Sequence, residues 1–265
     1  MTETSIIKPE FLYKYHRLNM HLMEMLTNAE LYMSKKSDLN DPLDLAYDLS
    51  FENYLSLYLK KYPSFKNDQE QLKRVKFLFD YKIDRGESDI ASDLDDLLTK
   101  TRVCCFTEDG NNPLMWSHYA DNHNGVCLKF KPSNDPELYS SLQMVNYLDR
   151  LVEIKDLSDF PKSLLTKLNV WSIEKEWRIL SEKERFRFKQ EVIVEIILGL
   201  NTTDKTMNWF KQFAENVYYY HAPIYRLAIR GSKIVKIDQF GDEVSDEKID
   251  TVRAYKDPFL DSLNL

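Results

Sequence analysis

Both the fold and the chemistry of this sequence depend on one stretch, Trp171-Ser172-Ile173-Glu174-Lys175-Glu176-Trp177-Arg178-Ile179-Leu180. Side chains of a β-strand alternate between two faces, so a strand here places Glu174, Glu176 and Arg178 on one face. Adjacent carboxylates repel each other unless a cation neutralises them or a reaction uses them, and Arg178 can supply the cation. The alternative is a solvated sheet edge with a surface ion pair that contributes at most about 1 kcal/mol. Trp171 and Trp177 bracket the carboxylates and favour partial burial.

Other short stretches rich in aromatic and β-branched residues also predict strands. They lie at 11–15, 31–33, 102–107, 125–130, 143–147, 192–198, 217–220 and around 230–232. Apolar residues recur at helical spacing over 18–29, 156–168 and 204–215, and over the longer region 43–100. We therefore expect one α+β domain over residues 1–265, with mixed or antiparallel central sheets and a helical insertion at 43–100.

The composition narrows the class of protein. Of the 265 residues, 43% are hydrophobic and 13% are aromatic, which is typical of a packed fold. The formal net charge of -7 gives no global attraction to phosphate backbones, although it leaves room for a local basic patch. The cysteines, Cys104, Cys105 and Cys127, lack CxxC spacing, so we expect neither a zinc site nor a disulfide framework.

Several signals are absent from the sequence. Residues 1–5 lack the basic and apolar regions of an export signal, and the longest apolar run, 192–200, is interrupted by Glu195. We therefore expect a cytoplasmic protein with no membrane partner. The sequence also lacks a glycine-rich dinucleotide or phosphate loop, a GxSxG nucleophile elbow and an HExxH zinc motif, which disfavours the fold classes built on them.

A second concentration of functional side chains is Met115-Trp116-Ser117-His118-Tyr119-Ala120, followed by His123 and Gly125. If residues 113–121 form a short helix, Met115, Trp116 and Tyr119 can cover the core while Ser117 and His118 face elsewhere. His118 is then either a ligand contact or a structural histidine bonded to backbone carbonyls, and both interpretations stay open. His118 and His123 do not have the i, i+4 spacing of a helical zinc pair, so we expect no metal.

A third feature combines the first predicted strand, Tyr13-Lys14-Tyr15-His16, with Asn40-Asp41-Pro42 in the loop that follows the second. Asn-Asp-Pro is typical of a turn and a helix start. Alternatively, the same residues fix a loop that grips a ligand.

Taken together, these residues resemble a widespread bacterial family of domains of unknown function. The resemblance covers residues 12 to about 200, and besides the two stretches quoted above it rests on three shorter motifs. These are Leu12-Tyr13-Lys14-Tyr15, Leu39-Asn40-Asp41-Pro42-Leu43-Asp44 and Cys105-Phe106-Thr107. More distantly, the arrangement is similar to ADP-ribosyltransferase-like domains, whose split sheet begins with a strand that grips NAD and ends with a strand that carries a catalytic Glu, often as Glu-x-Glu.

That resemblance implies an enzyme that cleaves the nicotinamide–ribose bond of NAD and transfers ADP-ribose to a protein or nucleic acid. Glu176 would be the catalytic carboxylate that stabilises the oxocarbenium character of the ribose, and Glu174 would orient or deprotonate the acceptor. The positional counterparts of the NAD-binding residues would be Tyr13 or Lys14 and Tyr32 or Ser34. The motifs described above add Asn40, Asp41, Trp116, His118, Tyr119 and Arg178 to the residues expected at the site. Related domains carry His or Arg on the first strand, where this chain has Tyr13-Lys14-Tyr15. The implied setting is a bacterial toxin or phage-defence effector, with an antitoxin or defence protein as partner.

Two other functions remain open. The first is a metal-independent nuclease or phosphodiesterase that uses His118 and His123 as acid and base, assisted by Glu174 or Glu176. The second is a sensor in which the same residues bind a nucleotide without turnover.

Overall fold

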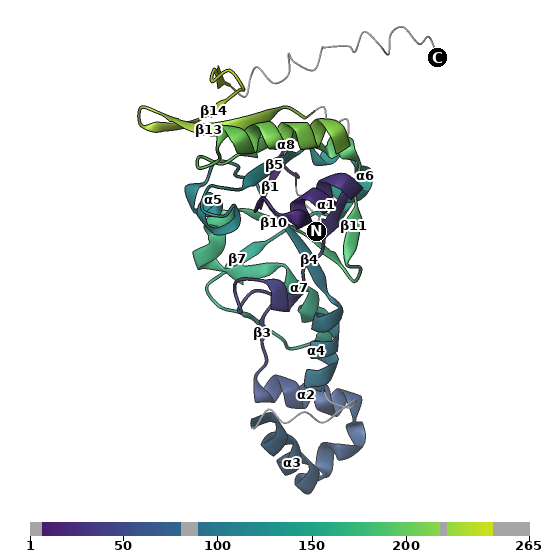
Figure 1. The fold of residues 1–265 in the computed structure, drawn as a ribbon. Coiled ribbons are helices and arrows are strands. Elements are labelled where there is room, and N and C mark those ends of the chain that lie inside the picture. The colour runs from purple at the N-terminus through teal and green to yellow at the C-terminus, as the bar shows by residue number, and fades with distance from the viewer. Residues whose placement is uncertain (1–6, 81–89, 218–221, 246–265) are drawn as a thin grey trace, which may run out of the picture. The chain divides into compact units, whose positions relative to one another are not determined.

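The computed structural model describes residues 7–80, 90–217 and 222–245. The chain divides into two compact units. Unit 1 comprises Met1–Leu12, Glu24–Asp109 and Pro132–Lys189, and unit 2 comprises Tyr13–Met23, Gly110–Lys131 and Gln190–Leu265. Both units combine helices with strands, which confirms the α+β class (Figure 1). In the described part of the chain, no helix is long and apolar enough to cross a membrane.

The strands of unit 1 form one antiparallel group and three small pairs. The strand β4 (Arg102–Thr107) pairs antiparallel with β10 (Glu176–Ser181), and β10 pairs antiparallel with β6 (Gln143–Met144). The small pairs are β2 (Glu30–Tyr32) with β11 (Arg185–Arg187), β3 (Tyr47–Asp48) with β8 (Val152–Glu153), and β7 (Asn146–Leu148) with β9 (Thr166–Leu168). The last two pairs are parallel, and the two partners of every pair in this unit are separated in the sequence by other elements.

The strands of unit 2 form a mixed sheet. Their order is β15 (Glu243–Val244), β14 (Lys233–Ile237), β13 (Ile224–Arg230), β12 (Ile193–Leu198), β5 (Val126–Phe130) and β1 (Leu12–His16). The pair β12 and β13 is parallel, whereas β12 pairs antiparallel with β5 and β13 pairs antiparallel with β14. Figure 1 shows the longest helix of this unit, α8 (Asp204–Val217), beside β13 and β14. Met207, Phe210 and Ala214 of that helix are buried.

The helices of the region 43–100 share one apolar core in unit 1. Ser50 caps α2 (Phe51–Lys61) by accepting a hydrogen bond from the Asn53 backbone N–H at 3.3 Å. Lys60 and Lys61 in its last turn interact favourably with the negative end of the helix dipole. Tyr54, Leu57 and Tyr58 of this helix are buried with residues from α3 (Gln69–Asp80), α4 (Ile90–Lys100) and α7 (Phe160–Leu164). The α-helices are α1 (Met20–Asn28), α2 (Phe51–Lys61), α3 (Gln69–Asp80), α4 (Ile90–Lys100), α5 (Pro113–Tyr119), α6 (Pro136–Ser141), α7 (Phe160–Leu164) and α8 (Asp204–Val217). The 3-10 helices are η1 (Lys36–Asp38), η2 (Pro63–Asn67), η3 (Pro132–Asn134), η4 (Leu157–Asp159), η5 (Asn169–Glu174) and η6 (Gln190–Val192).

Three predicted elements differ from the structure. The strand predicted over 171–180 begins only at Glu176, because residues 169–174 form η5 and Lys175 adopts a left-handed conformation with φ 43°. The helix predicted over 156–168 is η4 and α7 followed by strand β9, because residues 166–168 pair with β7. The strand predicted over 143–147 is split into β6 and β7, which have different partners. The strand predicted over 217–220 lies mostly outside the described residues.

Candidate functional site

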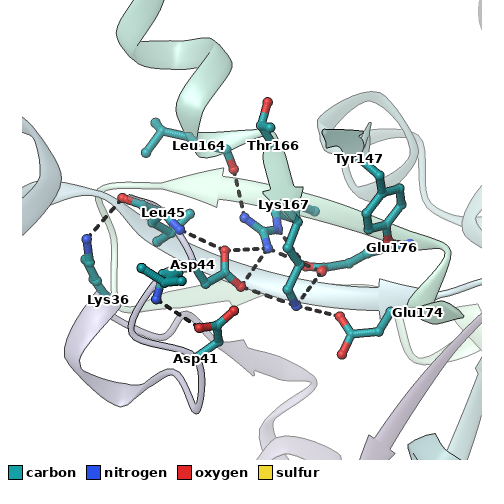
Figure 2. A network of polar contacts seen from close by, with 12 residues as sticks. Lys36, Asp41, Asp44, Leu45, Tyr147, Leu164, Thr166, Lys167, Glu174 and Glu176 are labelled. Atoms are coloured by element: carbon teal, nitrogen blue, oxygen red, sulfur yellow. Dashed lines mark hydrogen bonds and ion pairs between the residues drawn. The ribbon is translucent and has the colours of Figure 1, made fainter. Parts of the chain in front are cut away.

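Five buried charged side chains of unit 1 lie together, and we call them the charge cluster: Asp44, Lys167, Glu174, Glu176 and Arg178. They come from four places in the chain. Asp44 belongs to the turn before β3, Lys167 to β9, Glu174 to the end of η5, and Glu176 and Arg178 to β10. Figure 2 shows the carboxylates of Asp44, Glu174 and Glu176 turned toward Lys167.

Arg178 is completely buried, with 0% of its surface exposed. Its Nη2 donates to both carboxylate oxygens of Asp44, at 2.7 and 2.8 Å, and its Nε donates to Glu176 Oε1 at 2.6 Å. Its Nη1 donates to the Leu164 carbonyl at 2.9 Å. Each of the guanidinium nitrogens therefore has an acceptor, which is what allows an arginine to remain charged in the interior.

Lys167 places one ammonium among all three carboxylates. Its Nζ donates to Glu174 Oε2, and it lies 3.2 Å from Glu176 Oε2 and 3.4 Å from Asp44 Oδ2. The same nitrogen lies 5.0 Å from the centre of the Trp171 ring, a cation–π contact. Lys167 thus joins the loop residue Asp44 to both glutamates.

The cluster holds three carboxylate side chains and two cationic side chains, so its formal charge is -1. Burial by itself raises the pKa of Glu176, but the charges of Arg178 and Lys167 outweigh it and hold that pKa at about 2. Burial by itself lowers the pKa of Lys167, but the carboxylates of Glu176, Asp44 and Glu174 outweigh it and raise that pKa above its ordinary value. Glu176 and Lys167 are therefore both ionised at neutral pH.

Two neighbours hold Glu176 in place. The Glu176 backbone N–H donates to the Tyr147 hydroxyl at 2.8 Å, and burial together with the nearby Glu176 and Glu174 carboxylates raises the pKa of Tyr147 to about 12. On the other side, β10 pairs with β4, and Glu176 lies opposite Thr107 in the register. The left-handed Lys175 ends η5 and starts the strand, so two glutamates in different elements reach the same ammonium.

Burial rules out the interpretation of 174–178 as a solvated sheet edge. Glu174 and Glu176 are each 3% exposed. Taking charges out of water is expensive, and a buried ion cluster is often no more stable than well-packed apolar residues of the same volume. Five charges held in one place are therefore a reason to look for a functional role.

Sequence reasoning missed two members of the cluster. Asp44 belongs to the 39–44 motif, and its signal in the sequence is that it is a second acidic residue directly after Asn40-Asp41-Pro42. Lys167 carries no such signal, since only the pairing of β9 with β7 brings it near β10.

The other site residues predicted in unit 1 lie in the same unit with different contacts. Asp41 accepts a hydrogen bond from the Leu43 backbone N–H at 2.9 Å, as in a turn, and Asn40 is exposed beside it. Tyr32 is exposed, and its hydroxyl donates to Asp38 at 3.3 Å. Ser34 forms a backbone bridge with Val103. In the part of the chain that the structure describes, no hydrogen bond or ion pair joins Tyr32 or Ser34 to the charge cluster.

The aromatic residues predicted in unit 2 pack in a core. Trp116 is 0% exposed, donates from Nε1 to the Gly110 carbonyl at 3.1 Å and meets Tyr15 edge-on at 5.1 Å. Tyr13 and Tyr119 are partly buried against the same apolar cluster. Lys14, the neighbour of Tyr13 on β1, is half-buried. These residues belong to unit 2, so their approach to the charge cluster of unit 1 stays a prediction.

The histidines of the 115–125 stretch differ in their surroundings. His118 is exposed at the end of α5, with its ring 6.2 Å from that of Tyr119. The His123 ring lies parallel to Trp116 at 6.0 Å, and its Nε2 is 3.4 Å from Ser117 Oγ. Burial lowers the pKa of His123. Within the described residues, no group of three or more His, Cys, Asp or Glu side chains is placed to hold a metal ion.

The comparisons with known proteins identify similarity to one family. A family described as protein of unknown function (DUF2971) matches the chain over residues 115–179. The matched range includes the 115–125 stretch and every member of the charge cluster except Asp44. No curated protein matches the chain, and no solved structure matches it.

Proposed function

We propose that the chain is an NAD-dependent ADP-ribosyltransferase-like enzyme that modifies a macromolecule, with Glu176 as its catalytic carboxylate. The observation that carries this proposal is the surplus carboxylate of the charge cluster, in which three carboxylates are packed around two cations in the interior of unit 1. A fixed negative charge in a place that excludes water stabilises a positive charge that develops during a reaction.

The proposed reaction develops such a charge. The bond between the nicotinamide nitrogen and ribose C1′ breaks, its electron pair leaves with the nicotinamide, and the ribose becomes a cationic oxocarbenium species. Glu176 stabilises that species through the ribose hydroxyls, while Arg178 fixes the Glu176 carboxylate. A nucleophile of the acceptor then bonds to C1′ and gives up its proton to Glu174.

The residues at the border of the cluster fit a ligand with planar rings. Trp171 and Tyr147 are half-buried, and both contact members of the cluster. Aromatic side chains of this kind stack on nicotinamide or adenine. Asn40 and Asp41 precede Asp44 in the same loop and are further candidates for NAD contact in unit 1. We propose a bacterial toxin or phage-defence effector as the setting, with a protein or nucleic acid as acceptor.

The test is to measure nicotinamide release from NAD and transfer of labelled ADP-ribose to macromolecules of a bacterial lysate. Glu176→Gln keeps the shape of the side chain and removes its charge, and we expect a loss of at least about 100-fold, the usual effect of removing one electrostatic stabiliser. Glu182→Gln is the matched control, because Glu182 is exposed in the same unit. Its activity should equal that of the parent protein.

Two results would overturn the proposal. One is a folded Glu176→Gln variant, with an unchanged thermal midpoint, that releases nicotinamide at the parental rate. The other is a parent protein that binds NAD in calorimetry and returns it unaltered, which would instead support the nucleotide-sensing module.

A further inference from the structure

The hairpin formed by β13 and β14 in unit 2 has an unusual charge. Over residues 224–237 every charged residue is basic, namely Arg226, Arg230, Lys233 and Lys236, although the whole chain has a net charge of -7. The strands are joined by Gly231 and Ser232, with Gly231 at φ 61°, a conformation that glycine adopts without strain. The basic charge therefore lies on one regular two-stranded ribbon.

The cations at the base of the hairpin are neutralised by other elements of unit 2. Arg226 Nη1 lies 2.6 Å from Asp204 of α8, and Lys236 Nζ lies 2.8 Å from the buried Glu195 of β12. These pairs fasten the base of the ribbon to the sheet and to α8. The two cations at the tip of the ribbon, Arg230 and Lys233, then remain available to bind a partner.

The cations at the tip face each other. Arg230 and Lys233 are directly opposite in the strand register, and both are exposed. Arg230 donates to the Gly241 carbonyl at 3.4 Å, and within the described residues neither side chain has a carboxylate partner. Like charges placed directly opposite each other destabilise a hairpin. An anionic partner would remove that repulsion.

The opposite face of the same tip is apolar. Ile229 and Ile234 form the neighbouring cross-strand pair, and they are 64% and 39% exposed. Successive residues of a strand point to opposite faces, so the isoleucine pair and the cation pair lie on different sides of the ribbon. Figure 1 shows the strands running past the end of α8, which leaves both sides of the tip uncovered by that helix.

We propose that the tip of the β13–β14 hairpin binds duplex DNA by entering its major groove. That groove accepts a two-stranded β-ribbon, which presents one face to the base edges on the groove floor while its two strands run beside the flanking phosphate backbones. Ile229 and Ile234 then face the base edges and contact groups such as the thymine methyl. The long side chains of Arg230 and Lys233, one on each strand, extend to the phosphates of the two backbones. A flat membrane or protein surface lacks these two flanking rows of phosphates. The inference rests on unit 2 alone and does not depend on turnover of NAD.

The test is fluorescence anisotropy of a short labelled DNA duplex with the full chain at low salt. Lys233→Glu should weaken binding by about tenfold or more and reduce the slope of log affinity against log salt by about 1, because one phosphate contact is lost. Lys205→Glu, the same charge change at an exposed position of α8, is the matched control and should change affinity by less than about threefold. Ile229→Ser should weaken binding without altering the salt slope.

Three outcomes would overturn the inference. One is a parent protein that does not bind the duplex at low salt. Another is equal loss of affinity in Lys233→Glu and Lys205→Glu, which would mean that overall charge alone is responsible. The third is binding to single-stranded DNA, or to vesicles containing phosphatidylserine, that is as tight as duplex binding and equally sensitive to Lys233→Glu. Unchanged thermal midpoints of the variants ensure that each result concerns the surface of a folded protein.

Discussion

The charge cluster of unit 1 and the 115–125 stretch of unit 2 carry the most distinctive motifs of the sequence, and the structure uses them differently. In the 115–125 stretch, packing accounts for most of the motif: Met115 and Trp116 are core residues and the His123 ring lies against Trp116. In the charge cluster, packing accounts for little, because apolar side chains would fill the same volume without removing charges from water. A motif of buried charges is therefore the stronger indication of chemistry.

The glycine of the 115–125 stretch illustrates the packing role. A Cβ atom on Gly125 would lie 2.1 Å from the His16 carbonyl oxygen, so no other residue fits there without a shift of backbone. The preceding residues Asp121, Asn122 and His123 all have positive φ, at 50°, 51° and 66°. This sharp turn needs a glycine for close approach, which explains the motif without reference to a ligand.

The largest effect is expected at Arg178. Arg178→Met leaves Asp44 and Glu176 buried without their main cation, which should lower the free energy of unfolding by about 3–5 kcal/mol in urea denaturation. Arg187→Met is the matched control, since the Arg187 side chain is 81% exposed and pairs with Glu30 at the surface. Its loss should be at most about 1 kcal/mol.

If Arg178→Met does not fold, Arg178→Lys still tests the comparison. It keeps the positive charge but lacks the fork that bonds Asp44 and Glu176 together, so its stability should fall between those of the parent and the methionine variant. Equal stability of all three proteins would show that the cluster is no more dependent on charge than the 115–125 stretch.

Local patterns predicted the fold better than they predicted the site. Periodicity correctly indicated helices near α1, α2 and α8 and strands near β1, β4 and β12, because each is determined by its own apolar residues. It failed at 156–168, where Thr166–Leu168 leaves the helical pattern to pair with β7, a strand more than fifteen residues earlier in the chain. Tertiary pairing overrode local preference there.

Local patterns were also insufficient to predict which residues form the charge cluster. The prediction that Glu174, Glu176 and Arg178 share one face of a strand is wrong for Glu174, which lies in η5. The three side chains nevertheless belong to one network, since Lys167 pairs with both glutamates and Arg178 pairs with Glu176. Asp44 and Lys167 come from separate loops and strands, and spacing within one segment contains no information about them. Their burial, which changes a surface ion pair into an interior cluster, depends on the whole of unit 1.

An effect of intermediate size is expected on the stability of the protein when the pH is lowered. Burial, with a smaller contribution from the charge of Lys14, lowers the pKa of His16 from 6.5 to about 3, and burial also lowers the pKa of His123. Below about pH 6.5 these histidines therefore bind protons more readily in the unfolded chain than in folded unit 2. The free energy of unfolding decreases as the pH falls through that range. Glu176 has a pKa lowered from 4.5 to about 2, so its contribution is complete above about pH 4.5 and is lost only below it.

Amide hydrogen exchange can separate the two ranges. Between about pH 7 and about pH 5, after correction for intrinsic exchange, protection should decrease in β1 and β5 and remain constant in β10. His123→Asn, which tolerates the positive φ and does not titrate, should reduce the decrease. Equal loss of protection in β10 over this range would contradict the assignment of acid sensitivity to the histidines.

The smallest effect is expected at His118. His118→Ala should change the free energy of unfolding by less than about 0.5 kcal/mol, because the side chain is exposed. Trp116→Leu on the same helix is the contrast and should cost about 2–4 kcal/mol, since Trp116 is fully buried. A loss above about 1 kcal/mol for His118→Ala would mark a structural histidine. Metal-free RNA cleavage by the parent protein that disappears in His118→Ala would instead favour the nuclease, and it would make the 115–125 stretch, not the charge cluster, the catalytic one.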